Sequence, residues 1–299
     1  MRKEFAAKIG QLFESDDKLV FLTGDLGYNA LEEIQSKYSD RFINAGVAEQ
    51  NMVGLASGLA YEGHPSFVYS IAPFAVYRTL EQIRLDVCIH NHAVCIVGNG
   101  GGYGYGIMGA THHANEDLAC LSPLPNMVCW VPAFSEDVEY CLDQIVTRKG
   151  PAYLRLGLGV SYPQPVKIGL INQVIKSTKK PRLTIITQGP VVKNAIKALE
   201  GVEDVDLFSM LTLPILDFTP ELKNSIESTQ NVLVIEEHTE RGGLAEHLLM
   251  RLTREKLRLN QFEAFNAKGY PSKTYGSQDF HWKESGLDVE SIQNYLANN

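Results

Sequence analysis

Short apolar runs alternate with segments of helical periodicity along this chain, and this alternation constrains the fold more than any other feature. Residues 19–22, 66–70, 93–97 and 127–131 are uninterrupted apolar or nearly apolar runs. Such runs suit strands that are covered on both faces. Strands that alternate with helices form parallel sheets with helices on either side, so we predict an α/β fold with mostly parallel sheets.

The alternation fades once and then resumes, which indicates two domains. Residues 161–182 contain Pro163, Pro165 and Pro181 together with several lysines, a composition typical of a linker. We therefore expect an α/β domain over residues 1–160, a linker over 161–182 and a second α/β domain over 183–299. Strands of the second domain are expected at residues 183–187, 205–208 and 232–235.

Composition narrows the functional classes. The net charge of −8 argues against a nucleic acid or an anionic membrane as partner, because both require clustered Lys and Arg. No apolar run approaches the ~20 residues of a membrane span, and the N-terminus lacks the apolar core of a signal peptide. The five cysteines have no C-x-x-C spacing, so they support neither a disulfide framework nor a metal site. We expect buried, reduced thiols in a cytoplasmic protein.

One carboxylate stands at the start of an otherwise apolar helix. A short strand ends at Ile43, Gly46 allows the chain to turn, and apolar residues from Met52 to Leu59 then recur at the spacing of one helix face. Glu49 occupies the first turn of this helix. By itself such a glutamate is more often a helix-start signal, since the helix dipole favours negative charge there.

The exact sequence of this segment changes the interpretation of Glu49. Residues 46–52, Gly-Val-Ala-Glu-Gln-Asn-Met, followed by Gly-Leu-Ala-Ser-Gly-Leu-Ala at 54–60, resemble the transketolase family, and more narrowly the C-terminal half of a split transketolase. Deoxyxylulose-phosphate synthase and the β subunits of 2-oxo-acid dehydrogenases are similar. In this family the matching glutamate binds N1′ of the aminopyrimidine of thiamine diphosphate. The resemblance implies that Glu49 is catalytic and activates this cofactor by acid–base chemistry in a dry pocket.

The resemblance covers nearly the whole chain and implies a partner. It assigns the first domain as the pyrimidine-binding domain and the second, which contains Ile-Glu-Glu-His at 235–238, as the transketolase C-terminal domain. The chain lacks the Gly-Asp-Gly motif and the following Asn that bind the diphosphate and Mg²⁺ in these enzymes. Those ligands are therefore expected from an N-terminal subunit in an α2β2 assembly.

Further site residues follow from the resemblance. Phe74 matches the aromatic residue that packs on the cofactor's pyrimidine ring, and Tyr77 takes that role if the register differs. His112 matches the histidine that contacts an oxygen of the donor substrate, and His113 beside it is a further substrate-binding candidate. The alternatives are a core phenylalanine and a solvated histidine pair partnered by nearby acidic residues.

Two departures from the family's pattern concern the substrate. Met108 occupies the position at which the family usually has an aspartate that contacts a substrate hydroxyl. Gly100 or Gly101 occupies the position at which the family has a histidine or arginine that contacts the substrate phosphate. Arg155 matches an arginine near the substrate entrance, although a surface arginine at a strand end is an equal alternative. Because a phosphate needs convergent cations, we predict a substrate that lacks the terminal phosphate or is nucleotide-linked. Glycines would also widen the entrance for it.

Residues 98–109 are unusually rich in glycine. They formally satisfy the dinucleotide fingerprint but lack its strand–helix context and the following acidic residue. We interpret them as a flexible active-site loop whose backbone passes close to cofactor or substrate. The amides of such a loop could also bind a phosphate.

The predicted activity is transfer of a two-carbon ketol unit between sugars by a thiamine diphosphate-dependent enzyme that needs a partner subunit. Two alternatives stay open. One is the β subunit of a 2-oxo-acid dehydrogenase, and the other is a non-catalytic regulatory subunit that keeps the fold without the substrate residues.

Overall fold

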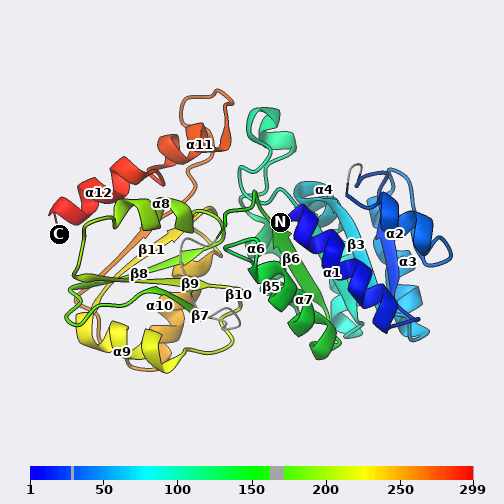
Figure 1. The fold of residues 1–299 in the computed structure, drawn as a ribbon, viewed down its shortest axis with the longest axis horizontal. Helices are drawn as coiled ribbons and strands as arrows, with labels where there is room; N and C mark the ends of the chain where they lie inside the picture. Colours follow the sequence, from blue (N-terminus) through cyan, green and yellow to red (C-terminus); the bar gives the residue numbers. More distant parts are fainter. Residues whose placement is uncertain (28–29, 162–171, 299) are drawn as a thin grey trace.

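The predicted alternation of strands and helices is present in two adjacent α/β halves, the first on the right and the second on the left of Figure 1. The computed structural model describes residues 1–27, 30–161 and 172–298. Each half contains a mostly parallel sheet with helices on both faces. The predicted fold class is therefore confirmed.

The first sheet has seven strands in the order β10-β5-β6-β4-β3-β1-β2. Its strands are β1 (Val20–Thr23), β2 (Phe42–Asn44), β3 (Ser66–Ile71), β4 (Val94–Asn99), β5 (Val128–Trp130), β6 (Ala152–Leu156) and β10 (Thr212–Leu213). All pairs are parallel except β10 on β5. Within β1, Phe21 packs into one core and Val20 and Leu22 into the other, which is why the strand sequences are continuously apolar.

The second sheet has five strands in the order β12-β11-β8-β9-β7. They are β7 (Asn172–Lys176), β8 (Leu183–Gln188), β9 (Val205–Met210), β11 (Asn231–Glu236) and β12 (Gln261–Phe265). β7 is an antiparallel edge strand formed by residues that the sequence placed in the linker. Residues 162–171 of the predicted linker lie outside the described residues. β10 also connects the halves, because it leaves the second half to pair with β5.

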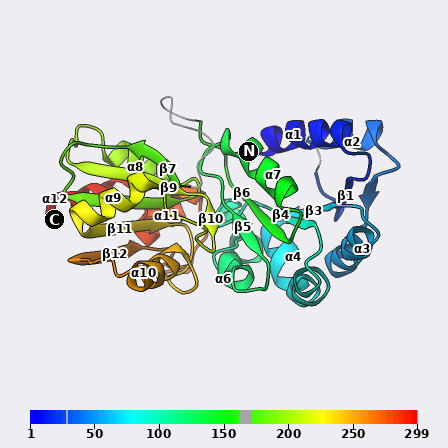
Figure 2. The same cartoon turned by 90° about the horizontal axis from the view of Figure 1, so that it is seen from below.

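Helices cover both faces of each sheet, as Figure 2 shows for α1 and α7 on one side of the first sheet and α3, α4 and α6 on the other. The helices of the first half are α1 (Arg2–Ser15), α2 (Glu32–Lys37), α3 (Glu49–Tyr61), α4 (Ala72–Val76), α5 (Leu80–Gln82), α6 (Asp117–Leu121) and α7 (Asp137–Arg148). Those of the second half are α8 (Val192–Ala198), α9 (Pro220–Thr229), α10 (Leu244–Arg254), α11 (Gln278–Ser285) and α12 (Val289–Asn298). Both apolar cores continue from the first half into the second.

The segment after β3 changes its helix type several times. Val76, Leu80, Ile83 and Val87 have the spacing of one helix face, whereas the chain forms α4, a 3₁₀ turn η1 (Tyr77–Thr79), α5 and a π-helix η2 (Ile83–Ile89). The Thr79 hydroxyl donates to the carbonyl of Ala75 and so competes with the regular backbone ladder. Changes of this kind within a helix are common at functional sites.

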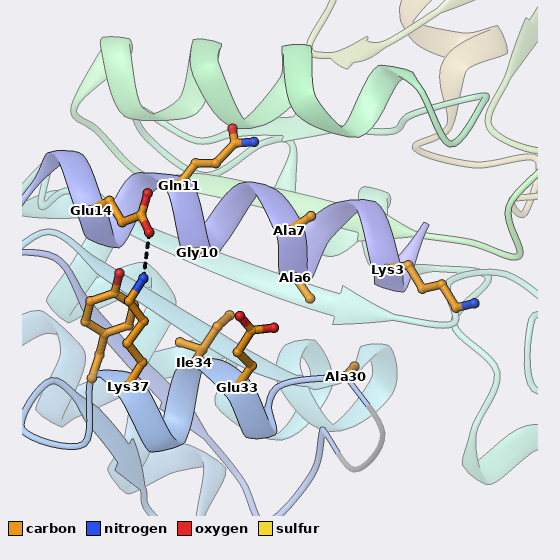
Figure 3. A pocket seen from close by; sticks show the side chains of 11 residues that line it. Lys3, Ala6, Ala7, Gly10, Gln11, Glu14, Ala30, Glu33, Ile34 and Lys37 are labelled. Carbon is orange, nitrogen blue, oxygen red and sulfur yellow. Dashed lines mark hydrogen bonds and ion pairs between the residues drawn. The ribbon is translucent and has the colours of Figure 1, made fainter.

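A cavity of about 390 Å³ lies between α1 and α2. Figure 3 shows small residues of α1, among them Ala6, Ala7 and Gly10, along its wall, with the Lys37 ammonium 2.6 Å from the Glu14 carboxylate. The candidate site residues described below do not line this cavity.

The five cysteines are free thiols, four of them buried, and burial raises the pKa of Cys88 to about 12. No helix within residues 1–27, 30–161 and 172–298 combines the length and the apolar character that a membrane span requires.

Candidate functional site

The candidate residues gather at the carboxyl ends of the parallel strands of the first sheet. α3 follows β2, α4 follows β3, and the glycine-rich loop follows β4. Since β2, β1, β3 and β4 are neighbours in one sheet, their C-terminal connections meet at the same edge. Ligand sites of open α/β sheets form at this edge.

Glu49 is buried at the N-terminus of α3, with 3% of its surface exposed. Gly46 precedes it with a φ of +71°, which supplies the predicted turn. The residue that caps α3 is Ala48, whose side chain makes no capping bond. Instead, the Glu49 carboxylate accepts a hydrogen bond from Nη1 of Arg78 at 3.0 Å. Burying a carboxylate costs more free energy than leaving it in water, so a helix-start signal alone does not account for the buried position of Glu49.

Phe74 and Arg78 lie one helical turn apart and face the same side. The guanidinium carbon of Arg78 is 4.2 Å from the centroid of the Phe74 ring. The Phe74 ring also meets the ring of His112 edge-on, with 5.2 Å between centroids. The structure therefore brings three predicted residues, Glu49, Phe74 and His112, into one cluster, with Arg78 between the first two.

Tyr77 points to a different neighbour. Its hydroxyl donates to Oε2 of Glu116 at 2.9 Å and accepts from the Glu116 amide at 3.2 Å. Burial raises the pKa of the Tyr77 hydroxyl, which keeps it protonated. Phe74 and Tyr77 were the two alternatives for the aromatic residue of the site. Of these, Phe74 is the one that packs against Arg78, the residue that pairs with Glu49.

His112 is half-buried at the end of η3 (Gly106–Thr111). Its Nδ1 lies 2.8 Å from the hydroxyl of Thr111, and its ring contacts both Phe74 and Tyr105. Met108, on the same 3₁₀ turn, is 52% exposed, and its contact with substrate stays a prediction.

His113 is buried and fully engaged within the chain. Its Nδ1 lies 2.9 Å from the Tyr270 hydroxyl, and its Nε2 lies 2.8 Å from the Gly106 carbonyl oxygen. Burial lowers its pKa to about 4, so the ring is neutral at pH 7. Its contact with substrate stays a prediction, while its observed contacts join the site loop to the second half.

Arg155 is buried on β6, with 4% of its surface exposed, so the surface-arginine alternative is wrong. Its Nε donates to the Asp117 carboxylate at 2.8 Å. Its Nη2 donates to the carbonyl oxygens of Ala114 at 2.7 Å and Glu237 at 3.1 Å. These bonds connect β6, the end of the site loop and the second half. Its role at the substrate entrance stays a prediction.

The glycine-rich loop passes close to its own chain, and this corrects two expectations. A Cβ at Gly101 would lie 2.5 Å from the Arg155 side chain, and one at Gly100 would overlap the Tyr105 ring. The glycines therefore admit neighbouring side chains and do not widen an entrance. Both amides donate to the carbonyl of Leu156, so neither is available to bind a phosphate.

The second half anchors the base of this loop. The Tyr103 amide donates to Oε1 of Glu237 at 2.9 Å, and Gln278 donates to the same carboxylate. Gly102 and Ala114 exchange backbone hydrogen bonds on either side of the loop. Sequence reasoning missed Glu237 and Arg78. The four-residue spacing from Phe74 was the available signal for Arg78, whereas only the tertiary structure shows the contact of Glu237.

The cluster fits an aminopyrimidine group. Glu49 offers a buried carboxylate for a ring nitrogen, and Phe74 offers a half-buried aromatic ring for stacking. These two groups would hold the pyrimidine portion of thiamine diphosphate.

Comparisons with known proteins agree with this geometry. Residues 1–158 match the transketolase pyrimidine-binding domain, and residues 172–292 match the transketolase C-terminal domain. The chain is 28% identical to one of the subunits of the apulose-4-phosphate transketolase of Phocaeicola vulgatus, over 97% of this chain and 94% of that protein. It is 31% identical to a putative transketolase C-terminal section of Methanocaldococcus jannaschii, over 98% and 93% of the two chains.

A similar solved structure is described as a split-gene transketolase in the form of an inactive β4 tetramer. The TM-score is 0.81 and the sequence identity 26%, and the match covers 99% of this chain and 96% of that chain. The 1-deoxy-D-xylulose-5-phosphate synthase of Clostridium perfringens is 29% identical over 98% of this chain, which spans 48% of that longer protein. The chain therefore belongs to the transketolase family, in which it corresponds to the pyrimidine-binding and C-terminal domains of a split transketolase.

Proposed function

We propose that this chain is the cofactor-activating subunit of a split transketolase, which transfers a two-carbon ketol unit between sugars together with an N-terminal subunit. The observation that carries the proposal is the buried Glu49 carboxylate within one cluster with Phe74 and His112. The split organisation is supported by two relatives, one named as a transketolase subunit and the other as a transketolase C-terminal section.

Thiamine diphosphate, when bound, supplies the carbon nucleophile that such a ketol transfer requires. Glu49 holds a proton at N1′ of the aminopyrimidine, and its burial keeps water away from that proton. Phe74 orients the ring by stacking. His112, positioned by Thr111 at Nδ1, presents Nε2 to an oxygen of the donor sugar and stabilises charge that develops there.

The diphosphate and Mg²⁺ are assigned to the N-terminal partner, because the sequence of this chain lacks the Gly-Asp-Gly motif. An α2β2 assembly places the cofactor between chains. The inactivity noted for the related β4 tetramer agrees with the need for such a partner. A cytoplasmic location belongs to the same proposal.

The substrate is proposed to lack a terminal phosphate or to be nucleotide-linked, since the loop offers no side-chain cation at Gly100 or Gly101. Arg2 lines two cavities beside Tyr105, of about 160 and 470 Å³, and Lys3 also lines the larger one, so these cations could reverse this preference. The relatives named for apulose 4-phosphate act on a phosphorylated sugar, so the substrate needs a direct test.

The test is an assay of the complex reconstituted with the N-terminal subunit. Ketol transfer would be measured with phosphorylated and non-phosphorylated ketoses, and 2-oxo-acid-dependent dye reduction would be measured in parallel. We expect ketol transfer. Dye reduction without ketol transfer would identify a 2-oxo-acid dehydrogenase subunit, and the absence of both would favour a regulatory subunit. Turnover of xylulose 5-phosphate and ribose 5-phosphate at an ordinary transketolase rate would refute the proposed substrate.

A further inference from the structure

The Glu49 carboxylate already has a partner within this chain. Arg78 donates from Nη1 to Oε2 at 3.0 Å, and its guanidinium carbon lies 4.2 Å from the Phe74 centroid. One planar cation thus contacts both groups that the proposed function assigns to the aminopyrimidine. A guanidinium suits these contacts because it stacks on aromatic rings and donates to carboxylates.

These contacts conflict with the proposed work of Glu49. The Arg78 guanidinium donates to Oε2 of Glu49. The proposed function assigns the same carboxyl group to a ring nitrogen of the cofactor. The guanidinium and the aminopyrimidine therefore compete for the same carboxylate.

Of the two ion-pair partners, only Arg78 can leave at small cost. The Glu49 side chain is 2% exposed, whereas that of Arg78 is 44% exposed. Rotation of Arg78 would return a charge to water without opening the core. Arg78 also lies on η1, the short 3₁₀ turn between α4 and α5, and such interruptions are typical of places where a helix moves.

We infer that the Glu49–Arg78 ion pair is a closed state of the free subunit, and that Arg78 is displaced when the aminopyrimidine binds Glu49. In the closed state the guanidinium compensates the charge of a buried carboxylate, for which the described part of the chain shows no other side-chain partner. This inference rests on the proposed function and adds a residue that opposes cofactor binding.

Calorimetry of thiamine diphosphate binding to the reconstituted complex, in the presence of Mg²⁺, tests the inference. Arg78→Ala is compared with wild type and with Arg84→Ala, which removes the same charge from an exposed position of η2. We expect Arg78→Ala to bind the cofactor roughly tenfold more tightly, the equivalent of one charge-assisted hydrogen bond. Arg84→Ala should bind like wild type. Unchanged or weaker binding by Arg78→Ala would overturn the inference.

A second comparison asks whether the effect passes through Glu49. In a Glu49→Gln background the amide oxygen can still accept from Arg78 but forms no ion pair, so adding Arg78→Ala should raise the affinity less than it does in wild type. An equal gain in both backgrounds would overturn the competition. If Arg78→Ala does not fold, Arg78→Lys keeps the charge and weakens stacking, and it should bind at least as tightly as wild type. Weaker binding by this variant counts against the inference.

The two proposals fail in different ways. A wild-type complex that does not bind thiamine diphosphate refutes the proposed function. A wild-type complex that binds it, with no gain for Arg78→Ala, refutes only the role of Arg78.

Discussion

Arg155→Met should destabilise the protein strongly, because it leaves a buried carboxylate without its cation. The Arg155 and Asp117 side chains are 5% and 0% exposed, and their N–O distance is 2.8 Å. Among the residues that the structure describes, Asp117 then keeps the hydroxyl of Tyr153, at 2.6 Å, and the backbone amide of Leu118 as donors. Breaking such a buried pair from one side costs about 3–5 kcal/mol. For a chain of this size that corresponds to a fall in Tm of about 5–8 °C.

The measurement is chemical and thermal unfolding of the variant, followed by circular dichroism. Arg182→Met is the matched control, since its pair with Asp204 has the same short distance, 2.9 Å, but side-chain exposures of 34% and 52%. It should lose no more than about 1 kcal/mol. The double variant Arg155→Met/Asp117→Asn should lose less than the sum of the single changes by about 1–3 kcal/mol. A loss below about 1 kcal/mol for Arg155→Met would refute the reasoning.

Three further predictions concern the site. Glu49→Gln should abolish ketol transfer by the complex while the circular dichroism melt stays close to wild type; retained turnover would exclude Glu49 as the activating group. The isolated chain should bind thiamine diphosphate weakly, and strong Mg²⁺-dependent heat in calorimetry would contradict the shared site. Because burial lowers the pKa of His113 from 6.5 to about 4, the unfolded chain binds more protons than the folded one, so stability should fall as pH drops from about 6.5 towards 4. Thermal melts across that range should show a shallower dependence for His113→Asn, and identical slopes would reject buried neutral His113.

Local patterns were sufficient for the architecture, and the resemblance of residues 46–60 to a known family was sufficient for the family. Continuous apolar strands and periodic helices predicted two α/β halves, since a parallel sheet buries both faces of each strand. The structure also brings the predicted residues Glu49, Phe74 and His112 into one cluster, because the connections after neighbouring strands meet at one sheet edge. Their catalytic roles stay predictions.

Only the tertiary structure decided which polar groups are buried and what they contact. Nothing in the local sequence distinguishes Arg155 at a surface from Arg155 paired with Asp117, because that pair joins residues 38 positions apart. Gly100 and Gly101 suggested an open loop, yet their missing side chains make room for Tyr105 and Arg155. Periodicity reports the apolar face of one element, whereas ion pairs and close backbone approaches depend on how separate elements pack. The Glu49–Arg78 ion pair also depends on packing, since its two residues are 29 positions apart and only the fold brings them together.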